Sequence, residues 1–157
     1  MQFKTFLQIG IISADVKESV KQFERFGITP WIPMHMDTDK MGGMIIDGKP
    51  GHLKFEGALF KNEQYEIEII QPVSESVFMD YLREHGPGVH HLAFKTAEEY
   101  DDFMEEFKGQ GMKTIIEAMA PTGDRGFAYL DTLKELGFYA EIHKGKPGGA
   151  DDFEGIE

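Results

Sequence analysis

Four polar side chains stand in strand-like segments of this sequence as candidate metal ligands: Gln8, Glu68, His91 and Glu141. Successive side chains of a strand point to opposite faces of a sheet, and in each segment the apolar neighbours take one face and leave the polar residue on the other. One amide oxygen, one imidazole and two carboxylates form a hard donor set suited to Zn²⁺, Ni²⁺, Co²⁺ or Mn²⁺, with room for water or substrate oxygens. We therefore predict one divalent ion per chain in an open, catalytic site.

An internal repeat relates these four residues in pairs. The segment QIGIISA, which begins at Gln8, aligns with HLAFKTA, which begins at His91, so that strand, capping residue and helix coincide. Gln8 then corresponds to His91, and Glu68 corresponds to Glu141, in the first and last strands of the two halves. A pseudo-twofold axis between the halves would bring all four side chains together.

The repeat also predicts the elements that position these residues. Residues 5–12 read as a buried strand, after which Ser13 caps a helix. Residues 90–95 read as a second such strand, after which Thr96 and Glu99 form a capping box. The buried stripes of the two helices are Val16, Val20, Phe23 and Phe26, and Tyr100, Phe103 and Phe107. Three more strands follow each helix, at about 28–36, 52–60 and 64–71, and at about 112–118, 125–131 and 136–143.

The chain is therefore expected to have an α+β fold, in which two tandem βαβββ modules form a curved sheet with a central metal cleft. We place the first module at 1–73, a connecting helix and turn at 74–88, the second module at 89–143, and a loose acidic tail at 144–157. The loop 37–51 contains methionines, glycines and a proline, and is a candidate lid, although a plain surface loop is the commoner case.

Other polar residues near the four have weaker claims. His90 shares a strand face with Leu92 and Phe94, so we expect it to pack beneath a helix. His143 shares the face of Glu141 and is a candidate to contact the ligand set, although exposure at the strand end is an equal alternative. Glycine-rich phosphate loops, a nucleophilic serine elbow and an HExxH zinc motif are missing from the sequence.

Composition limits the partners. The chain has 157 residues with 41% hydrophobic content, which suffices for a core, and its zero cysteines exclude disulfides, thiolate metal sites and a cysteine nucleophile. A net charge of −12 disfavours nucleic acid and anionic membranes as partners. The start of the sequence resembles neither a signal peptide nor a membrane span. We expect a cytoplasmic protein that acts on a small-molecule substrate, and a homodimer, because open half-barrels leave sheet edges that pairing would cover.

Three segments, GPGVHHLAFKT, YEIEIIQP and FAYLDTLKELGFYAEI, resemble the glyoxalase, bleomycin-resistance and extradiol dioxygenase superfamily, also called vicinal oxygen chelate. The resemblance covers about residues 5–143 and implies a glyoxalase-like fold. Methylmalonyl-CoA epimerases look most similar, and their ligand positions correspond to Gln8, Glu68, His91 and Glu141. Gln8 departs from the usual histidine of epimerases and is similar to the Gln, Glu, His, Glu set of eukaryotic glyoxalase I. The run YLDTLKELG also lacks the His-Pro-Lys found in epimerases.

The resemblance leaves several functions open. An epimerase would remove and return the proton α to the carbonyl of a 2-substituted malonyl-CoA, with Glu141 and Glu68 as catalytic carboxylates and Glu56 or Glu66 as further candidates for the second base. A glyoxalase I-like lyase would do related chemistry on a thiol adduct of a 2-oxoaldehyde. A bleomycin-resistance-like module would bind a ligand without metal. An iron dioxygenase ranks last, because Gln8 replaces one of the two histidines that it needs.

Overall fold

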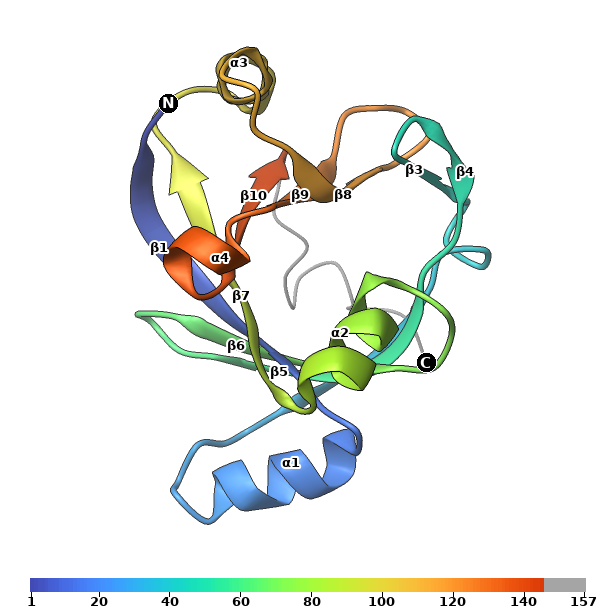
Figure 1. Cartoon of the computed structure of the whole chain (residues 1–157). Helices are drawn as coiled ribbons and strands as arrows, with labels where there is room; N and C mark the ends of the chain where they lie inside the picture. The colour runs from blue at the N-terminus through green and yellow to red at the C-terminus, as the bar shows by residue number, and fades with distance from the viewer. Residues whose placement is uncertain (146–157) are drawn as a thin grey trace.

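The computed structural model describes residues 1–145, and in this part of the chain one strongly curved sheet dominates the fold (Figure 1). The sheet has the strand order β2-β5-β6-β1-β7-β10-β9-β8-β3-β4. The strands are β1 (Phe3–Ile12), β2 (Ile32–Asp37), β3 (Met44–Ile46), β4 (Lys49–Gly51), β5 (Lys54–Lys61), β6 (Glu66–Pro72), β7 (Gly88–Thr96), β8 (Thr114–Met119), β9 (Gly126–Leu130) and β10 (Tyr139–Lys144). The predicted α+β class is confirmed. The tail predicted at 144–157 lies, from residue 146 onward, outside the described residues.

The centre of the sheet is the antiparallel pair β1 and β7. Strand β6 runs parallel to β1 on one side, and β10 runs parallel to β7 on the other, so the same pairing scheme occurs on both sides of the centre. The edges that each half would expose if it stood alone are therefore joined within one chain. The free edges of the described sheet are β2 and β4. A dimer remains a prediction, but the need to cover the inner edges is no longer a reason for it.

Four helices connect the described strands: α1 (Val16–Glu24), α2 (Val77–His85), α3 (Tyr100–Gly109) and the short α4 (Leu133–Leu136). Figure 1 shows α1 and α3 on the outer side of the curved sheet, where α1 packs on β5 and β6 and α3 packs on β10. Helix α2 instead contributes Phe78 to the inner core. Helix α4 was not predicted from the sequence.

Both predicted helix caps were wrong by a few residues. The N-cap of α1 is Asp15, whose carboxylate accepts a hydrogen bond from the Glu18 amide, while the Ser13 hydroxyl accepts one from the Asp15 amide. Residue Glu99 is the N-cap of α3 and makes no side-chain capping bond. The hydroxyl of Thr96 donates to the Glu98 carbonyl. Short polar residues compete for the same few backbone groups, so a capping pattern locates a helix start only approximately.

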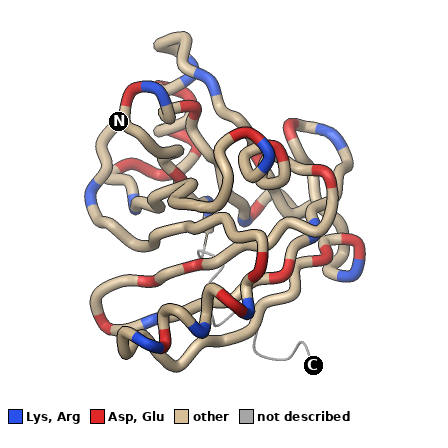
Figure 2. The backbone as a smooth tube through the Cα atoms, turned by 60° about the horizontal axis from the view of Figure 1, so that its bottom comes forward, with Lys and Arg blue, Asp and Glu red and all other residues tan. Residues whose placement is uncertain are grey.

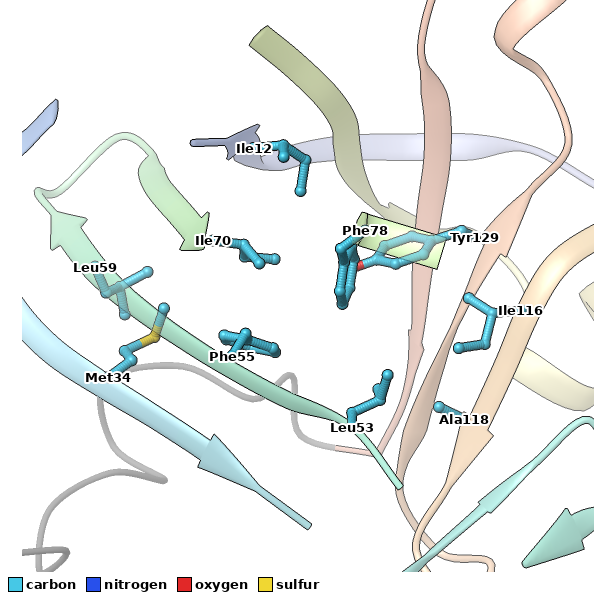
Figure 3. Packing of buried hydrophobic residues seen from close by; sticks show 10 residues of the cluster. All are labelled: Ile12, Met34, Leu53, Phe55, Leu59, Ile70, Phe78, Ile116, Ala118 and Tyr129. Atoms are coloured by element: carbon cyan, nitrogen blue, oxygen red, sulfur yellow. The ribbon is translucent and has the colours of Figure 1, made fainter. Parts of the chain in front are cut away.

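The inner core fills the concave side of the sheet. Its buried residues come from strands on both sides of the centre, from α2 and from Leu53 just before β5. Figure 3 shows them facing one another across the interior: Ile12, Met34, Leu53, Phe55, Leu59, Ile70, Phe78, Ile116, Ala118 and Tyr129. The rings of Phe78 and Tyr129 meet edge to face with centroids 5.7 Å apart. Several of these core residues also form the wall of the cavity described below.

The segment 37–51, predicted as a loop, contains the hairpin of β3 and β4. Strand β3 pairs with β8 through Ile45 and Ile46, so a segment of the first half extends the sheet on the side of the second half. The predicted loop is corrected to this extent. The apolar run that forms β3 has only three residues, too few for periodicity to distinguish a strand from a loop.

Charges are spread over the described chain. Figure 2 shows acidic positions along much of the described backbone, interleaved with basic ones, so in this view the acidic residues do not form one patch. None of the helices within residues 1–145 is long and apolar enough to cross a membrane.

Candidate metal and active site

Three of the four predicted ligands meet at the buried ring of His91. Its Nε2 atom lies 3.3 Å from Oε2 of Glu68 and 3.3 Å from Oε2 of Glu141. The register of the sheet explains this meeting, because Gly10 of β1 pairs with Glu68 of β6 on one side and with His91 of β7 on the other. Strand β10 lies beyond β7 and pairs Tyr139 with His91, which places Glu141 two residues further along.

Gln8 lies two residues from Gly10 on β1 and is also buried. Its amide nitrogen donates to Oε2 of Glu66 at 3.3 Å, and Oε1 of Glu66 pairs with Nζ of Lys61 at 3.0 Å. The amide oxygen of Gln8, which is the atom that would bind a metal, takes no part in this contact. Glu66, one of the residues considered as a second base, is thus paired with Lys61 and Gln8.

Glu141 is held on one side by a second histidine. Nε2 of His143 lies 3.0 Å from Oε1 of Glu141, while Oε2 of Glu141 is buried without a hydrogen bond. Burial alone would raise the pKa of Glu141, but the nearby His143 and His91 more than offset it, and the net pKa lies below its usual value. Burial opposes charge on His143, yet Glu141 raises the pKa of that imidazole. His143 therefore contacts the ligand set rather than solvent at the strand end.

Aromatic residues enclose His90 and His91. The Tyr129 ring lies over His91 with centroids 4.7 Å apart, and burial, followed by the charges of Glu141 and Glu68, raises the pKa of its hydroxyl well above the usual value. His90 packs against Phe78 and Tyr81 of α2, so it lies beneath a helix as predicted, but beside His91 in the inner core and not on the face of Leu92 and Phe94. Burial, followed by the neighbouring His91 and His85, lowers the pKa of His90 to about 2, so this ring is neutral.

A cavity of about 440 Å³ opens in front of the carboxylates. Its polar lining includes Gln8, Glu68, Glu141 and His143, and Arg125 is the one Lys or Arg among the described residues that line it. The rest is largely apolar: Met36, Met41, Met44, Leu53, Phe55, Ile70, Phe78, Pro121 and Phe127. The segment that contains the β3–β4 hairpin supplies one wall. The volume is that of a small-molecule site.

The donor set fits a divalent ion. Nε2 of His91 and Oε2 of Glu141 are both buried without a hydrogen-bond partner among the described residues, which is costly unless something binds them. Atoms bound to one ion at about 2.1 Å lie about 3.0–3.4 Å apart in octahedral or tetrahedral geometry, and the two 3.3 Å separations fall in this range. Across residues 1–145, no three His, Asp or Glu side chains are spaced as a finished metal cage. The side chains of Glu68, His91 and Glu141 therefore lie close together, but they do not surround a common point at metal-ligand distances.

Glu56, the other residue considered as a second base, lies away from the cavity. It pairs with His35 across the β2–β5 ladder and is not among the residues that line the cavity. Alternation along β5 explains this placement, because the neighbouring Phe55 faces the cavity and Glu56 must face outward.

Sequence reasoning missed two residues on which the site depends, Gly10 and Tyr129. A β-carbon at position 10 would lie 1.9–2.3 Å from atoms of the His91 ring, so only glycine leaves space for that ring. A lone glycine inside a strand is a recognised signal of such close approach and could have indicated it. Tyr129 gave no signal, since a tyrosine in a buried strand is usually a core residue.

Comparison with known proteins identifies the family. Residues 7–129 match the model of the Glyoxalase/Bleomycin resistance protein/Dioxygenase superfamily. None of the curated proteins matches the chain.

Solved structures share the fold at low sequence identity. Methylmalonyl-CoA epimerase from Mycobacterium tuberculosis has a TM-score of 0.65 at 17% identity, over 92% of this chain and 90% of that one. A hypothetical protein from Bacillus halodurans C-125 has a TM-score of 0.65 at 19% identity, over 90% and 94%. A variant of Streptomyces coelicolor methylmalonyl-CoA epimerase in complex with 2-nitronate-propionyl-CoA has a TM-score of 0.63 at 16% identity, over 92% and 99%. Together with the match over residues 7–129, the glyoxalase-like fold shows that the chain belongs to the Glyoxalase/Bleomycin resistance protein/Dioxygenase superfamily.

Proposed function

We propose that the protein is a metal-dependent enzyme that removes and returns a proton α to a carbonyl, acting as an epimerase on a small acyl-CoA. One observation carries this proposal: two carboxylates, Glu68 and Glu141, flank the buried Nε2 of His91 at the end of a cavity of about 440 Å³. The neighbouring structures named as methylmalonyl-CoA epimerases, one of them with an acyl-CoA analogue, support the choice of substrate class.

Gln8, Glu68, His91 and Glu141 would hold the ion. When bound, a divalent ion supplies a Lewis acid that polarises the substrate carbonyl and makes the α-proton more acidic. The apolar cavity wall excludes water and seats the acyl group. Arg125, which lines the cavity, would pair with an anionic part of the substrate.

The two carboxylates approach from opposite sides. Glu68 comes from β6 and Glu141 from β10, and these strands flank the central β1–β7 pair on its two sides. An epimerase must take a proton from one face of the α-carbon and return it to the other, which suits bases placed in this way. His143 holds Oε1 of Glu141, so Oε2 is the oxygen that faces His91. We assign the proton transfer to Glu141 and Glu68.

A second candidate is a glyoxalase I-like lyase, which one residue favours. Gln8 on the first strand, with Glu68, His91 and Glu141, is similar to the ligand set of eukaryotic glyoxalase I. The same carboxylates would then move the proton of a thiol adduct of a 2-oxoaldehyde. For either function we propose a cytoplasmic location, since a cysteine-free chain suits a reducing compartment. We also propose that the protein is a homodimer.

Deuterium exchange at the α-carbon tests both candidates. Wild-type protein supplied with Zn²⁺, Ni²⁺ or Co²⁺ is incubated in D₂O with methylmalonyl-CoA and, separately, with the glutathione adduct of methylglyoxal. Exchange with the first substrate alone supports the epimerase, and exchange with the second alone supports the lyase. Glu141→Gln should slow exchange by at least about a hundredfold, the usual contribution of a general base.

Glu56→Gln is the matched control, because Glu56 lies on the same sheet but pairs with His35 away from the cavity. It should exchange at the wild-type rate. If Glu141→Gln exchanges as fast as wild type, the assignment of Glu141 as a base is wrong. Exchange of neither substrate by any metal-loaded form would remove both candidates.

A further inference from the structure

His90 and His91 are neighbours in sequence whose rings nevertheless meet. Successive residues of a regular strand point to opposite faces, but the β1–β7 ladder pairs Gly10 with His91 and Ile11 with Val89, which leaves His90 as the extra residue of a bulge. Both rings therefore reach Tyr129, and their Nδ1 atoms lie 3.0 Å apart. At this distance one Nδ1 donates a hydrogen bond and the other accepts it.

The surroundings of His90 decide which ring is the donor. His90 is completely buried, and its Nε2 has no hydrogen-bond partner among the described residues. Its ring is enclosed by four aromatic rings, those of Phe78, Tyr81, Tyr129 and Tyr139. An N–H group can be directed at an aromatic face, whereas a ring lone pair finds no favourable partner there. A neutral His90 is therefore best accommodated with its proton on Nε2 and its lone pair on Nδ1.

We propose that His90 is a positioning residue that accepts a hydrogen bond from Nδ1–H of His91 and so keeps the Nε2 lone pair of His91 directed at the ion. This inference rests on the proposed metal site and adds the residue that prepares its only nitrogen ligand. With the opposite direction of the hydrogen bond, His91 would carry its proton on Nε2, between Glu68 and Glu141, where it would block the ion. Metal-binding histidines are commonly fixed through their second ring nitrogen in this way.

Two variants of similar shape separate hydrogen bonding from packing. His90→Asn keeps an acceptor near the position of Nδ1, whereas His90→Leu fills a similar volume without one. In zinc titrations against a competing chelator, His90→Leu should bind about ten- to a hundredfold more weakly than wild type, the usual effect of losing such a partner. His90→Asn should stay near wild type. Thermal unfolding of both variants reports separately on packing. Wild-type zinc affinity in a folded His90→Leu protein would overturn the proposal.

The direction of the hydrogen bond can be observed in the wild-type protein itself. Long-range ¹H–¹⁵N correlation spectra of the imidazole groups, assigned with the two His90 variants and His91→Ala, show which ring nitrogens carry protons. We expect a protonated Nδ1 on His91 with and without Zn²⁺. An unprotonated Nδ1 on His91 would overturn the inference. If wild type bound no zinc, the proposed function would fail, while the metal-free spectrum would still decide the role of His90.

Discussion

The imidazole of His91 occupies the space that a side chain at position 10 would need. The β-carbon of any other residue at position 10 would lie 1.9 Å from Cε1 and 2.0 Å from Nε2 of the His91 ring. Because Gly10 pairs with Glu68 on one side and with His91 on the other, it also sets the lateral spacing of these two side chains. A glycine without chemistry of its own thus makes the meeting of the candidate ligands possible.

Gly10→Ala should displace the His91 ring. We expect zinc affinity to fall at least about tenfold, the lower end of what displacing a ligand's support costs, and stability to fall by about 1–3 kcal/mol through overpacking. Chelator competition and urea unfolding measure the two effects. The control is Gly88→Ala on the same strand pair, where an added β-carbon meets nothing within 4 Å. Wild-type zinc binding by Gly10→Ala would contradict the geometry described.

Glu66→Ala should weaken metal binding without altering the fold. Glu66 accepts from the amide of Gln8 and pairs with Lys61, so it fixes the orientation of the Gln8 side chain. Loss of such a supporting partner typically costs about tenfold in affinity. The exposed Glu63→Ala in the preceding turn is the control for a lost negative charge. Equal zinc affinities in the two variants would show that Glu66 does not position Gln8.

Thr132→Val should lower the free energy of unfolding, because Thr132 anchors the start of β10, the strand that carries Glu141. The Thr132 hydroxyl donates to the Phe138 carbonyl at 2.8 Å and accepts from the Ala140 amide at 2.9 Å. Valine keeps the shape but removes both hydrogen bonds, at a cost of about 1–2 kcal/mol. Urea unfolding measures this cost, and Thr5→Val at an exposed position of β1 gives the background. An unchanged unfolding free energy in Thr132→Val would rule the anchoring role out.

A homodimer is still expected, for a different reason from the one the sequence offered. The inner strand edges are joined within the chain, but Phe3 and Phe6 of β1 remain 37% and 39% exposed where both contact the Phe94 ring, and an exposed apolar cluster favours association. Light scattering at micromolar concentration should give twice the mass of 17.8 kDa. A monomer mass at that concentration would refute the expectation.

Strand alternation predicted that Gln8, Glu68, His91 and Glu141 face the same side of the sheet, because the two faces of each strand differ in polarity. Alternation failed at His90, where the bulge in β7 turns two consecutive side chains into the same core. A bulge depends on the partner strand, and no single segment encodes it. That the His91 ring is the group that approaches Gly10 likewise follows from cross-strand register, although a lone glycine in a strand signals that some close approach occurs. Local sequence patterns thus indicated which residues could bind a metal, while strand pairing determined which of their side chains come into contact.

The central claim is that one divalent ion binds to Gln8, Glu68, His91 and Glu141. Elemental analysis of the purified protein tests this claim most directly. Wild type and His91→Ala are each incubated with Zn²⁺, Ni²⁺ and Co²⁺ in turn, desalted, and analysed for metal per chain. The account predicts about one ion per wild-type chain and far less in His91→Ala, which loses the only nitrogen ligand and leaves two carboxylates facing each other. Stoichiometric metal in neither protein, or equal metal in both, would contradict it.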